Sequence, residues 1–177
     1  NQGWEPLQAA SLLQALAVYN IQHCEEPIAR WNYMSLPALK EKSPIPIMAD
    51  ECCFDEHDAE RLISLSCCDL INIKLGKSSG IFKAQKIIKL AEAAGIKLQL
   101  GGFLESRLGF SAAAHLAFTS NNIIHYDFDT PLMFVEDPIS AGMQYGNNGE
   151  ILVSDDPGLG AFIDDKYLHS LTKVFIQ

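Results

Sequence analysis

The sequence has no apolar run that approaches the length of a membrane-spanning helix, which takes about 20 residues. Basic residues are also few: 13 Lys and Arg stand against 22 Asp and Glu, a net charge of -9, and they form no cluster. Because nucleic-acid binding rests on the neutralisation of phosphates by Lys and Arg, this charge argues against a nucleic-acid partner. The composition therefore favours neither a membrane protein nor a nucleic-acid-binding protein.

The five cysteines form neither a disulfide framework nor a zinc motif. Their number is odd, and four of them are adjacent pairs, Cys52 with Cys53 and Cys67 with Cys68. No spacing of Cys and His matches a zinc site. We therefore expect reduced thiols, buried as small apolar side chains, in a cytoplasmic protein.

The length of the chain suits part of a larger protein. A closed (β/α)₈ barrel typically takes about 250 residues, and this chain has 177. It opens with Asn1-Gln2-Gly3-Trp4, without an initiator Met and at a point typical of a strand end. We therefore expect it to be the C-terminal part of something longer, in which case any function belongs to the whole.

Extended and helical segments alternate along the first 132 residues, a pattern typical of an α/β fold with a parallel sheet. The predicted strands are 21–25, 47–50, 70–75, 97–101 and 123–127. The predicted helices are 6–19, 33–42, a segment capped by Asp55, 81–94 and 107–119. We expect about strands 4 to 8 of a TIM-like (β/α)7-8 barrel over 1–132.

Two details of these helices are also predicted. Leu7, Ala10, Leu13 and Ala17 are expected to form the buried face of the first helix. Pro37 is expected to interrupt the second. Beyond Leu132 the alternation stops and glycine-rich turns follow, with one short strand at 151–153. We expect 133–177 to be a C-terminal tail that packs on an N-terminal capping domain outside this chain.

Charged side chains recur where the predicted strands end, about 25 residues apart. The ends of barrel strands form one rim, so residues far apart in the sequence meet there. Glu25 and Asp50, at neighbouring strand ends, would repel each other unless a cation lay between them. A hard divalent ion with oxygen ligands, Mg²⁺ or Mn²⁺, fits this pair. The alternative is that the two acids stabilise the N-termini of the following helices.

Lys74 follows the third apolar run. The neighbouring Ile73 and Leu75 would bury its stem, and strand alternation places Asn72 on the same side as Lys74. Burial and a nearby metal would lower the pKa of Lys74, as a base requires. The alternative is a surface lysine whose stem lies along apolar side chains. The loop 76–80 lacks the P-loop pattern and is predicted to be a βα turn.

Asp127 and Asp129 follow the last predicted strand and share one side of an extended backbone. Together they could bind a cation, and an ammonium group is the favoured one because Glu25 and Asp50 already account for a metal. The alternative is an exposed polar turn, where acids are common.

Six motifs occur in the order typical of one family. They are Asn1-Gln2-Gly3-Trp4, Glu25-Glu26-Pro27, Ala49-Asp50-Glu51, Asn72-Ile73-Lys74-Leu75, Gly102-Phe103-Leu104-Glu105-Ser106 and Asp127-Phe128-Asp129-Thr130-Pro131-Leu132. Over residues 1 to about 160 the chain resembles the C-terminal barrel segment of the enolase superfamily, in its muconate-lactonizing subgroup, and most closely the dipeptide epimerases.

The resemblance implies a metal centre and an acid/base pair. Glu25 and Asp50 correspond to the second and third ligands of one Mg²⁺, with Mn²⁺ as the alternative ion, and Lys74 corresponds to the catalytic acid/base lysine. The first ligand and a second lysine, in a Lys-x-Lys motif, are expected outside this chain. Neighbouring side chains expected to support these groups are Asn1, Glu51 and Glu105.

The resemblance also implies a substrate pocket. Gly102, Phe103 and Leu104 correspond to its wall, while Asp127 and Asp129 correspond to the pair that grips the α-ammonium group of a dipeptide. Two departures from the pattern are Glu26, where many relatives have Gln, and Cys52-Cys53, where Ser commonly follows the Asp-Glu pair.

The activity implied by the resemblance is dipeptide epimerisation, a 1,1-proton transfer at the carbon α to the substrate carboxylate through a metal-stabilised enediolate. A cycloisomerase, an N-acylamino acid racemase and a noncatalytic barrel fragment stay open as alternatives. The expected partners are a small dipeptide and the capping domain and barrel strands 1 to 3 of the same protein. A homo-oligomer also stays open.

Overall fold

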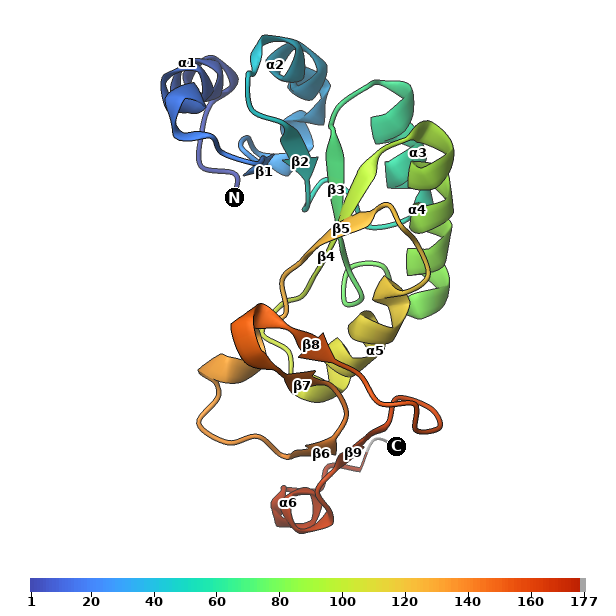
Figure 1. Cartoon of the computed structure of the whole chain (residues 1–177). Coiled ribbons are helices and arrows are strands. Elements are labelled where there is room, and N and C mark those ends of the chain that lie inside the picture. The colour runs from blue at the N-terminus through green and yellow to red at the C-terminus, as the bar shows by residue number, and fades with distance from the viewer. Residues whose placement is uncertain (176–177) are drawn as a thin grey trace. The chain divides into compact units, whose positions relative to one another are not determined.

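The computed structural model describes residues 1–175, which divide into two compact units. The first unit, Asn1–Gly101 and Ser120–Asp127, holds a parallel sheet (Figure 1). Its strands lie side by side in chain order: β1 (Cys24–Glu25), β2 (Ile47–Ala49), β3 (Leu70–Lys74), β4 (Lys97–Gly101) and β5 (Ile123–Tyr126). All four pairings are parallel. The predicted α/β class with five successive parallel strands is therefore confirmed.

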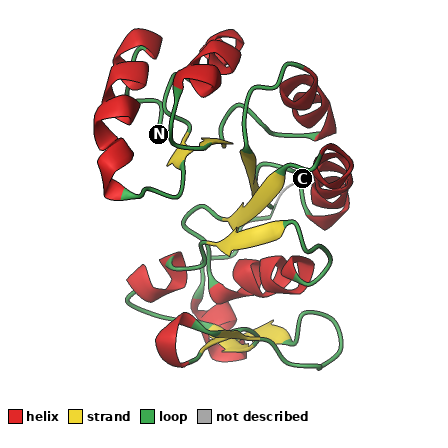
Figure 2. Ribbon diagram, turned by 45° about the horizontal axis from the view of Figure 1, so that its top comes forward, coloured by secondary structure: helices red, strands yellow, loops and turns green. Residues whose placement is uncertain are grey.

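Helices of the first unit run between these strands and lie around them (Figure 2). Helix α1 (Pro6–Leu16) precedes β1, and the helices α2 (Leu36–Lys42), α3 (Glu56–Ser64) and α4 (Ile81–Ala94) each follow one strand. Two 3₁₀ segments, η1 (Ala17–Tyr19) and η2 (Arg30–Ser35), extend this part. Helix α4 has the predicted bounds and ends at Gly95, whose φ of 72° is left-handed.

Two predicted details of the helices are wrong in part or in full. Of the face expected for the first helix, Leu13 is buried, but Leu7 is 82% exposed and Ala17 is also exposed, while α1 buries Ala9 as well. Pro37 does not interrupt a helix but lies in the first turn of α2, where its missing N–H would have no helical partner in any case. Asp55 caps α3 as predicted, because its carboxylate accepts hydrogen bonds from the backbone N–H groups of His57 and Asp58.

The sheet is curved enough for its two outermost strands to make contact through side chains. The rings of His23, next to β1, and His125, on β5, have centroids 4.8 Å apart. In a flat sheet, with strands about 4.8 Å apart, β1 and β5 would be separated by about 19 Å. Contact across that span fits a sheet rolled like the wall of a barrel.

The second unit, Gly102–Thr119 and the residues from Phe128 on, is built on α5 (Arg107–Ala117). Phe110 is fully buried, with its ring centroid 5.1 Å from that of Phe128. The guanidinium of Arg107 pairs with Asp137 and donates to the backbone carbonyls of Ile139, Ala141 and Met143.

The remaining elements of this unit are a 3₁₀ turn η3, the antiparallel pairs β6–β9 and β7–β8, a 3₁₀ turn η4 and a helix α6. Their bounds are η3 (Thr130–Met133), β6 (Ile139–Ala141), β7 (Gln144–Tyr145), η4 (Asn147–Gly149), β8 (Ile151–Leu152), β9 (Ala161–Ile163) and α6 (Asp165–Ser170). Only β8 matches a predicted element. The division at residue 132 stays a prediction, and the last two residues of the predicted tail lie outside the described residues.

The five cysteines are free, as expected, and four of them are buried. In the part of the chain that the structure describes, no helix has the length and apolar character needed to span a membrane.

Candidate metal and proton-transfer site

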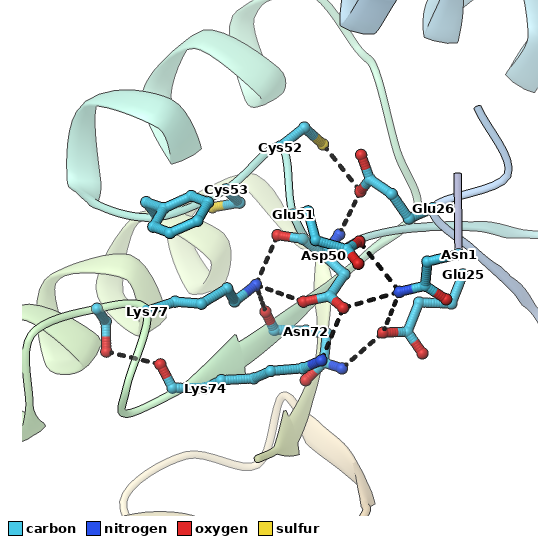
Figure 3. A network of polar contacts seen from close by, with 12 residues as sticks. Asn1, Glu25, Glu26, Asp50, Glu51, Cys52, Cys53, Asn72, Lys74 and Lys77 are labelled. Atoms are coloured by element: carbon cyan, nitrogen blue, oxygen red, sulfur yellow. Dashed lines mark hydrogen bonds and ion pairs between the residues drawn. The ribbon is translucent and has the colours of Figure 1, made fainter. Parts of the chain in front are cut away.

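The strand ends bring three predicted residues together. Glu25 is the last residue of β1, Asp50 directly follows β2, and Lys74 is the last residue of β3. Because the strands are parallel and adjacent, their carboxyl ends form one edge, and the three side chains meet there (Figure 3). These groups therefore form one polar cluster within the first unit.

Asp50 is the centre of this cluster and is fully buried. Its Oδ2 accepts a hydrogen bond from Lys74 Nζ at 2.7 Å and one from Asn1 Nδ2 at 2.8 Å. Its Oδ1 accepts from Lys77 Nζ at 2.6 Å. Both carboxylate oxygens are thus engaged by positively charged or amide donors, which is what a buried charge requires.

Glu25 lies beside Asp50. Asn72 Nδ2 donates to Glu25 Oε1 at 2.9 Å, which confirms that Asn72 points to the same side of β3 as Lys74. Gly101 on β4 leaves room for that amide, because a Cβ there would lie 2.8 Å from Asn72 Oδ1. The cluster therefore depends on a small residue in the neighbouring strand.

Asn1 joins three carboxylates. Its Nδ2 donates to Asp50 Oδ2 at 2.8 Å, to Glu51 Oε2 at 3.0 Å and to Glu25 Oε1 at 3.4 Å. Asn1 thus lies against Glu25 and Asp50, the two predicted metal ligands, and Glu51 shares the same amide.

The pKa shifts follow from this crowding of charges. Burial raises the pKa of Glu25, and the adjacent Asp50 raises it further, while Asn72 and Asn1 act in the opposite direction. Burial acts to raise the pKa of Asp50 too, yet Lys77 and Lys74 bring it below its usual value. The pKa of Lys74 is raised, because the pairing with Asp50 outweighs burial. The lowered pKa predicted for Lys74 is therefore not found beside an ionised Asp50.

Two features of the cluster were not predicted. Lys77 belongs to the βα turn, as expected for 76–80, but it is buried, and its Nζ reaches Asp50. A lysine between Gly76 and Ser78 looks like an exposed turn residue, and nothing in the local pattern indicates otherwise.

Glu26 and Cys52, both departures from the family pattern, contact each other. Glu26 Oε2 accepts a hydrogen bond from the Asp50 backbone N–H at 2.6 Å and one from Cys52 Sγ at 3.2 Å. Burial raises the pKa of both side chains. Glu26 therefore supports the backbone at Asp50, and Cys52 contacts the same carboxylate oxygen.

The donor set fits a hard divalent cation. Carboxylates from β1 and β2 converge on a single donor nitrogen of Asn1, and oxygen ligands of this kind suit Mg²⁺ and Mn²⁺. Across residues 1–175, however, no three His, Cys, Asp or Glu side chains form a group able to hold a metal ion. The described residues thus offer two adjacent carboxylates and no complete ligand set.

The predicted pocket residues lie at the start of the second unit. Gly102 is closely packed, because a Cβ there would lie 2.5 Å from the ring of Phe110. Phe103 and Leu104 are exposed. Glu105 Oε1 accepts a hydrogen bond from the Phe103 backbone N–H at 3.1 Å, which closes a tight turn. Glu105 thus orders the 102–105 loop.

Asp127 and Asp129 flank Phe128 in the segment after β5. Both acids are exposed, whereas Phe128 is buried against Phe110.

Comparison with known proteins places this arrangement in a family. Residues 1–167 match the family described as Enolase C-terminal domain-like. The chain belongs to this family. The relationship expected from the six motifs is therefore confirmed.

Individual members of the enolase C-terminal domain-like family are close in sequence. The chain is 53% identical over 177 residues to D-Ala-D/L-Ala epimerase of Cytophaga hutchinsonii, covering 100% of this chain and 48% of that protein. It is 40% identical over 162 residues to L-Ala-D/L-Glu epimerase of Clostridium acetobutylicum, covering 90% and 45%. The chain thus spans about half the length of the curated relatives it matches.

A solved structure in this family is similar over nearly the whole chain. It is a dipeptide epimerase from Cytophaga hutchinsonii complexed with Mg and the dipeptide D-Ala-L-Val, with a TM-score of 0.97 and 53% identity. The match covers 98% of this chain and 47% of that one. The fold is therefore that of the C-terminal part of such an enzyme.

Proposed function

We propose that the whole protein to which this chain belongs is a divalent-metal-dependent dipeptide epimerase. The observation that carries the proposal is the cluster of Glu25, Asp50 and Lys74 at successive strand ends, in a chain 53% identical to a D-Ala-D/L-Ala epimerase. The bound Mg and dipeptide in the related structure support the same reaction class. The barrel strands 1 to 3, the capping domain, the first metal ligand and the second lysine would lie in the part of the protein outside this chain.

Glu25 and Asp50 would hold the cation, with Asn1 and Glu51 as their neighbours. A proton α to a carboxylate is too weakly acidic for an amine to remove unaided. The divalent ion, Mg²⁺ or Mn²⁺, supplies the positive charge that stabilises the negative charge developing on the substrate carboxylate. Both protein carboxylates lie at strand ends, and this rigid support keeps the ligand positions preorganised.

Lys74 would carry the proton on one face of the α-carbon. Its Nζ lies 2.7 Å from Asp50 Oδ2, so it stands next to the ligand position. The stem is largely buried, with 13% of the side chain exposed, which limits the directions that the ammonium can take. A lysine on the opposite face, outside this chain, would complete the 1,1-proton transfer and invert the stereocentre.

Asp127 and Asp129 would bind the α-ammonium group of the dipeptide, and Gly102, Phe103 and Leu104 would line its pocket. Exposure of both acids supports this role, since an ammonium ligand must be able to reach them. Free cysteines agree with a cytoplasmic location, which we include in the proposal.

The test follows the α-hydrogens of a dipeptide panel by ¹H NMR in D₂O with the complete protein and Mg²⁺. We expect exchange of the α-hydrogen and appearance of the epimer for at least one dipeptide. Asp127→Asn with Asp129→Asn should lower kcat/KM for dipeptides by about 10²- to 10³-fold, since each Asn keeps an acceptor oxygen but both negative charges that would pair with the ammonium are lost.

The matched control is Asp155→Asn with Asp156→Asn, an exposed pair in the second unit whose loss changes the net charge equally. It should leave dipeptide turnover unchanged. The substrate of an N-acylamino acid racemase carries no α-ammonium group, so such an enzyme would keep its turnover when either pair of acids is replaced. Absence of α-hydrogen exchange with every dipeptide would refute the enzymatic proposal.

A further inference from the structure

Lys77 is a buried ammonium that the proposed reaction does not use. It lies in the turn between β3 and α4, and only 1% of its side chain is exposed. Its Nζ donates to Asp50 Oδ1 at 2.6 Å, to the Asp50 backbone carbonyl at 2.5 Å and to the Asn72 backbone carbonyl at 2.9 Å. An ammonium has three hydrogens, so its whole donor capacity is directed at Asp50 and at the adjacent strand.

The turn is built to place this lysine inward. Both Lys77 and Ser78 donate their backbone N–H groups to the Lys74 carbonyl, at 2.9 and 3.0 Å. The chain then turns through Ser79 and Gly80, which have φ values of 57° and 98°. Positive φ at a non-glycine residue is uncommon and carries strain. Within this turn the Lys77 side chain reaches back to β3, where its Nζ contacts the Asn72 carbonyl, before α4 begins at Ile81.

Lys77 and Lys74 divide the Asp50 carboxylate between them. Lys77 holds Oδ1, whereas Lys74 and Asn1 contact Oδ2. Oδ2 is also the oxygen on the side of Glu25, because the same Asn1 nitrogen contacts Oδ2 and Glu25 Oε1. With Oδ1 occupied from the interior, a single oxygen of Asp50 faces the polar cluster.

We propose that Lys77 is a positioning residue of the metal centre: its buried ammonium holds Asp50 by Oδ1 and by the backbone carbonyl, so that Asp50 presents Oδ2 alone to the cation. The inference rests on the proposed function, since it concerns the same ligand. Three bonds to two neighbouring strands fix both the rotation of the carboxylate and the backbone that carries it. Partners of this kind orient metal ligands, and their loss typically costs about 10- to 100-fold in metal affinity.

The direction in which metal affinity changes when Lys77 is removed distinguishes two roles for this residue. Lys77 carries a positive charge near the cation, and repulsion alone would weaken metal binding. If Lys77 acted only as a nearby charge, its removal would tighten the binding of a divalent ion. If it orients Asp50, removal weakens binding.

The experiment measures the Kd of Mn²⁺ alone, by calorimetry and by the EPR signal of free Mn²⁺, with the complete protein and no substrate. Lys77→Met removes the ammonium and keeps a stem of similar length. We expect the Kd to rise about 10- to 100-fold, and the activity lost at low Mg²⁺ to return largely at saturating Mg²⁺. Such recovery by metal would not occur if Lys77 served folding alone.

Lys83→Met is the matched control. Lys83 lies on α4, its side chain is 39% exposed, and its partner Glu56 keeps Lys86. It should leave the Kd of Mn²⁺ unchanged. Lys77→Gln, which keeps two amide donors without the charge, replaces Lys77→Met if that variant does not fold. It should raise the Kd of Mn²⁺ about threefold or more, which is less than the increase expected for Lys77→Met.

A folded Lys77 variant that binds Mn²⁺ as tightly as the unaltered protein, or more tightly, would overturn the inference while leaving the proposed function intact. Failure of the unaltered protein to bind Mn²⁺ would overturn both. Glu25→Gln distinguishes failure of the Lys77 inference from failure of the proposed function. It should weaken Mn²⁺ binding whether or not Lys77 has a positioning role.

Discussion

Replacing Lys74 by Met tests the assignment of the proton carrier. Met keeps most of the buried stem volume and removes the ammonium that lies 2.7 Å from Asp50 Oδ2. Acid/base catalysis by a positioned side chain typically contributes about 10²- to 10⁴-fold. At about 1.36 kcal/mol for each tenfold change in rate, this amounts to about 2.7 to 5.4 kcal/mol of transition-state stabilisation.

The effect of the same change on folding should be smaller. Asp50 loses one charged donor but keeps Lys77 on Oδ1 and Asn1 on Oδ2. Its negative charge is therefore still compensated, and the expected loss is that of one hydrogen bond to a charged group, about 1.5 to 3 kcal/mol. A loss of that size lowers the unfolding midpoint without unfolding a protein of ordinary stability.

The assay combines turnover with isotope exchange. In D₂O, Lys74→Met should abolish exchange for the dipeptide epimer whose α-hydrogen faces Lys74. Exchange should persist for the other epimer, because its proton is taken by the lysine on the opposite face. Urea unfolding measured in parallel shows whether the variant is folded.

Lys86→Met is the control for Lys74→Met. Lys86 lies on α4, and 43% of its side chain is exposed. It pairs with Glu56 and belongs to none of the strand ends that carry Glu25, Asp50 and Lys74. It should keep full turnover. If Lys74→Met remained folded and epimerised dipeptides within about tenfold of the unaltered rate, Lys74 would not be the proton carrier.

Two further predictions concern stability. Asp55→Ala should lower the free energy of unfolding, measured by urea denaturation, by about 1 kcal/mol, because the N-terminus of α3 loses the acceptor for two backbone N–H groups. Asp55→Asn keeps an acceptor and should lower the free energy of unfolding by less. Equal losses in the two variants would contradict the capping role. Lys86 and Lys83 lower the pKa of Glu56 from 4.5 to about 2, so the stabilisation from its ionised form is present above about pH 4.5 and is lost as the pH falls toward 2. Glu56→Gln should flatten the pH dependence of unfolding in that window, and an unchanged profile would contradict the assignment.

Local sequence patterns were sufficient for the strand ends. Short segments rich in apolar residues identified β2, β3, β4 and β5 to within one or two residues, because strands of a parallel sheet are covered on both faces. A charged residue at or directly after the end of β2, β3 and β5 was then visible as a candidate. Strand alternation correctly placed Asn72 with Lys74, because side chains of an extended backbone alternate in direction.

Long-range packing decided what the local pattern could not. Leu7 fits the apolar face of α1 by spacing but is exposed, since the direction of burial depends on the elements that surround a helix. The strands of the second unit are two or three residues long and pair antiparallel across irregular turns, so all of them except β8 carry too little periodicity to be recognised.

By itself, the sequence determined the α/β class, the order of five parallel strands, the family and the identity of Glu25, Asp50 and Lys74 as charged strand-end residues. These depend on local periodicity and on motifs read along the chain. Only the tertiary structure showed that Lys77 turns inward to hold Asp50 and that Glu26 meets Cys52 behind it. A buried charge is tolerated only where distant segments supply its partners, and the pairing of such segments is a property of the folded chain.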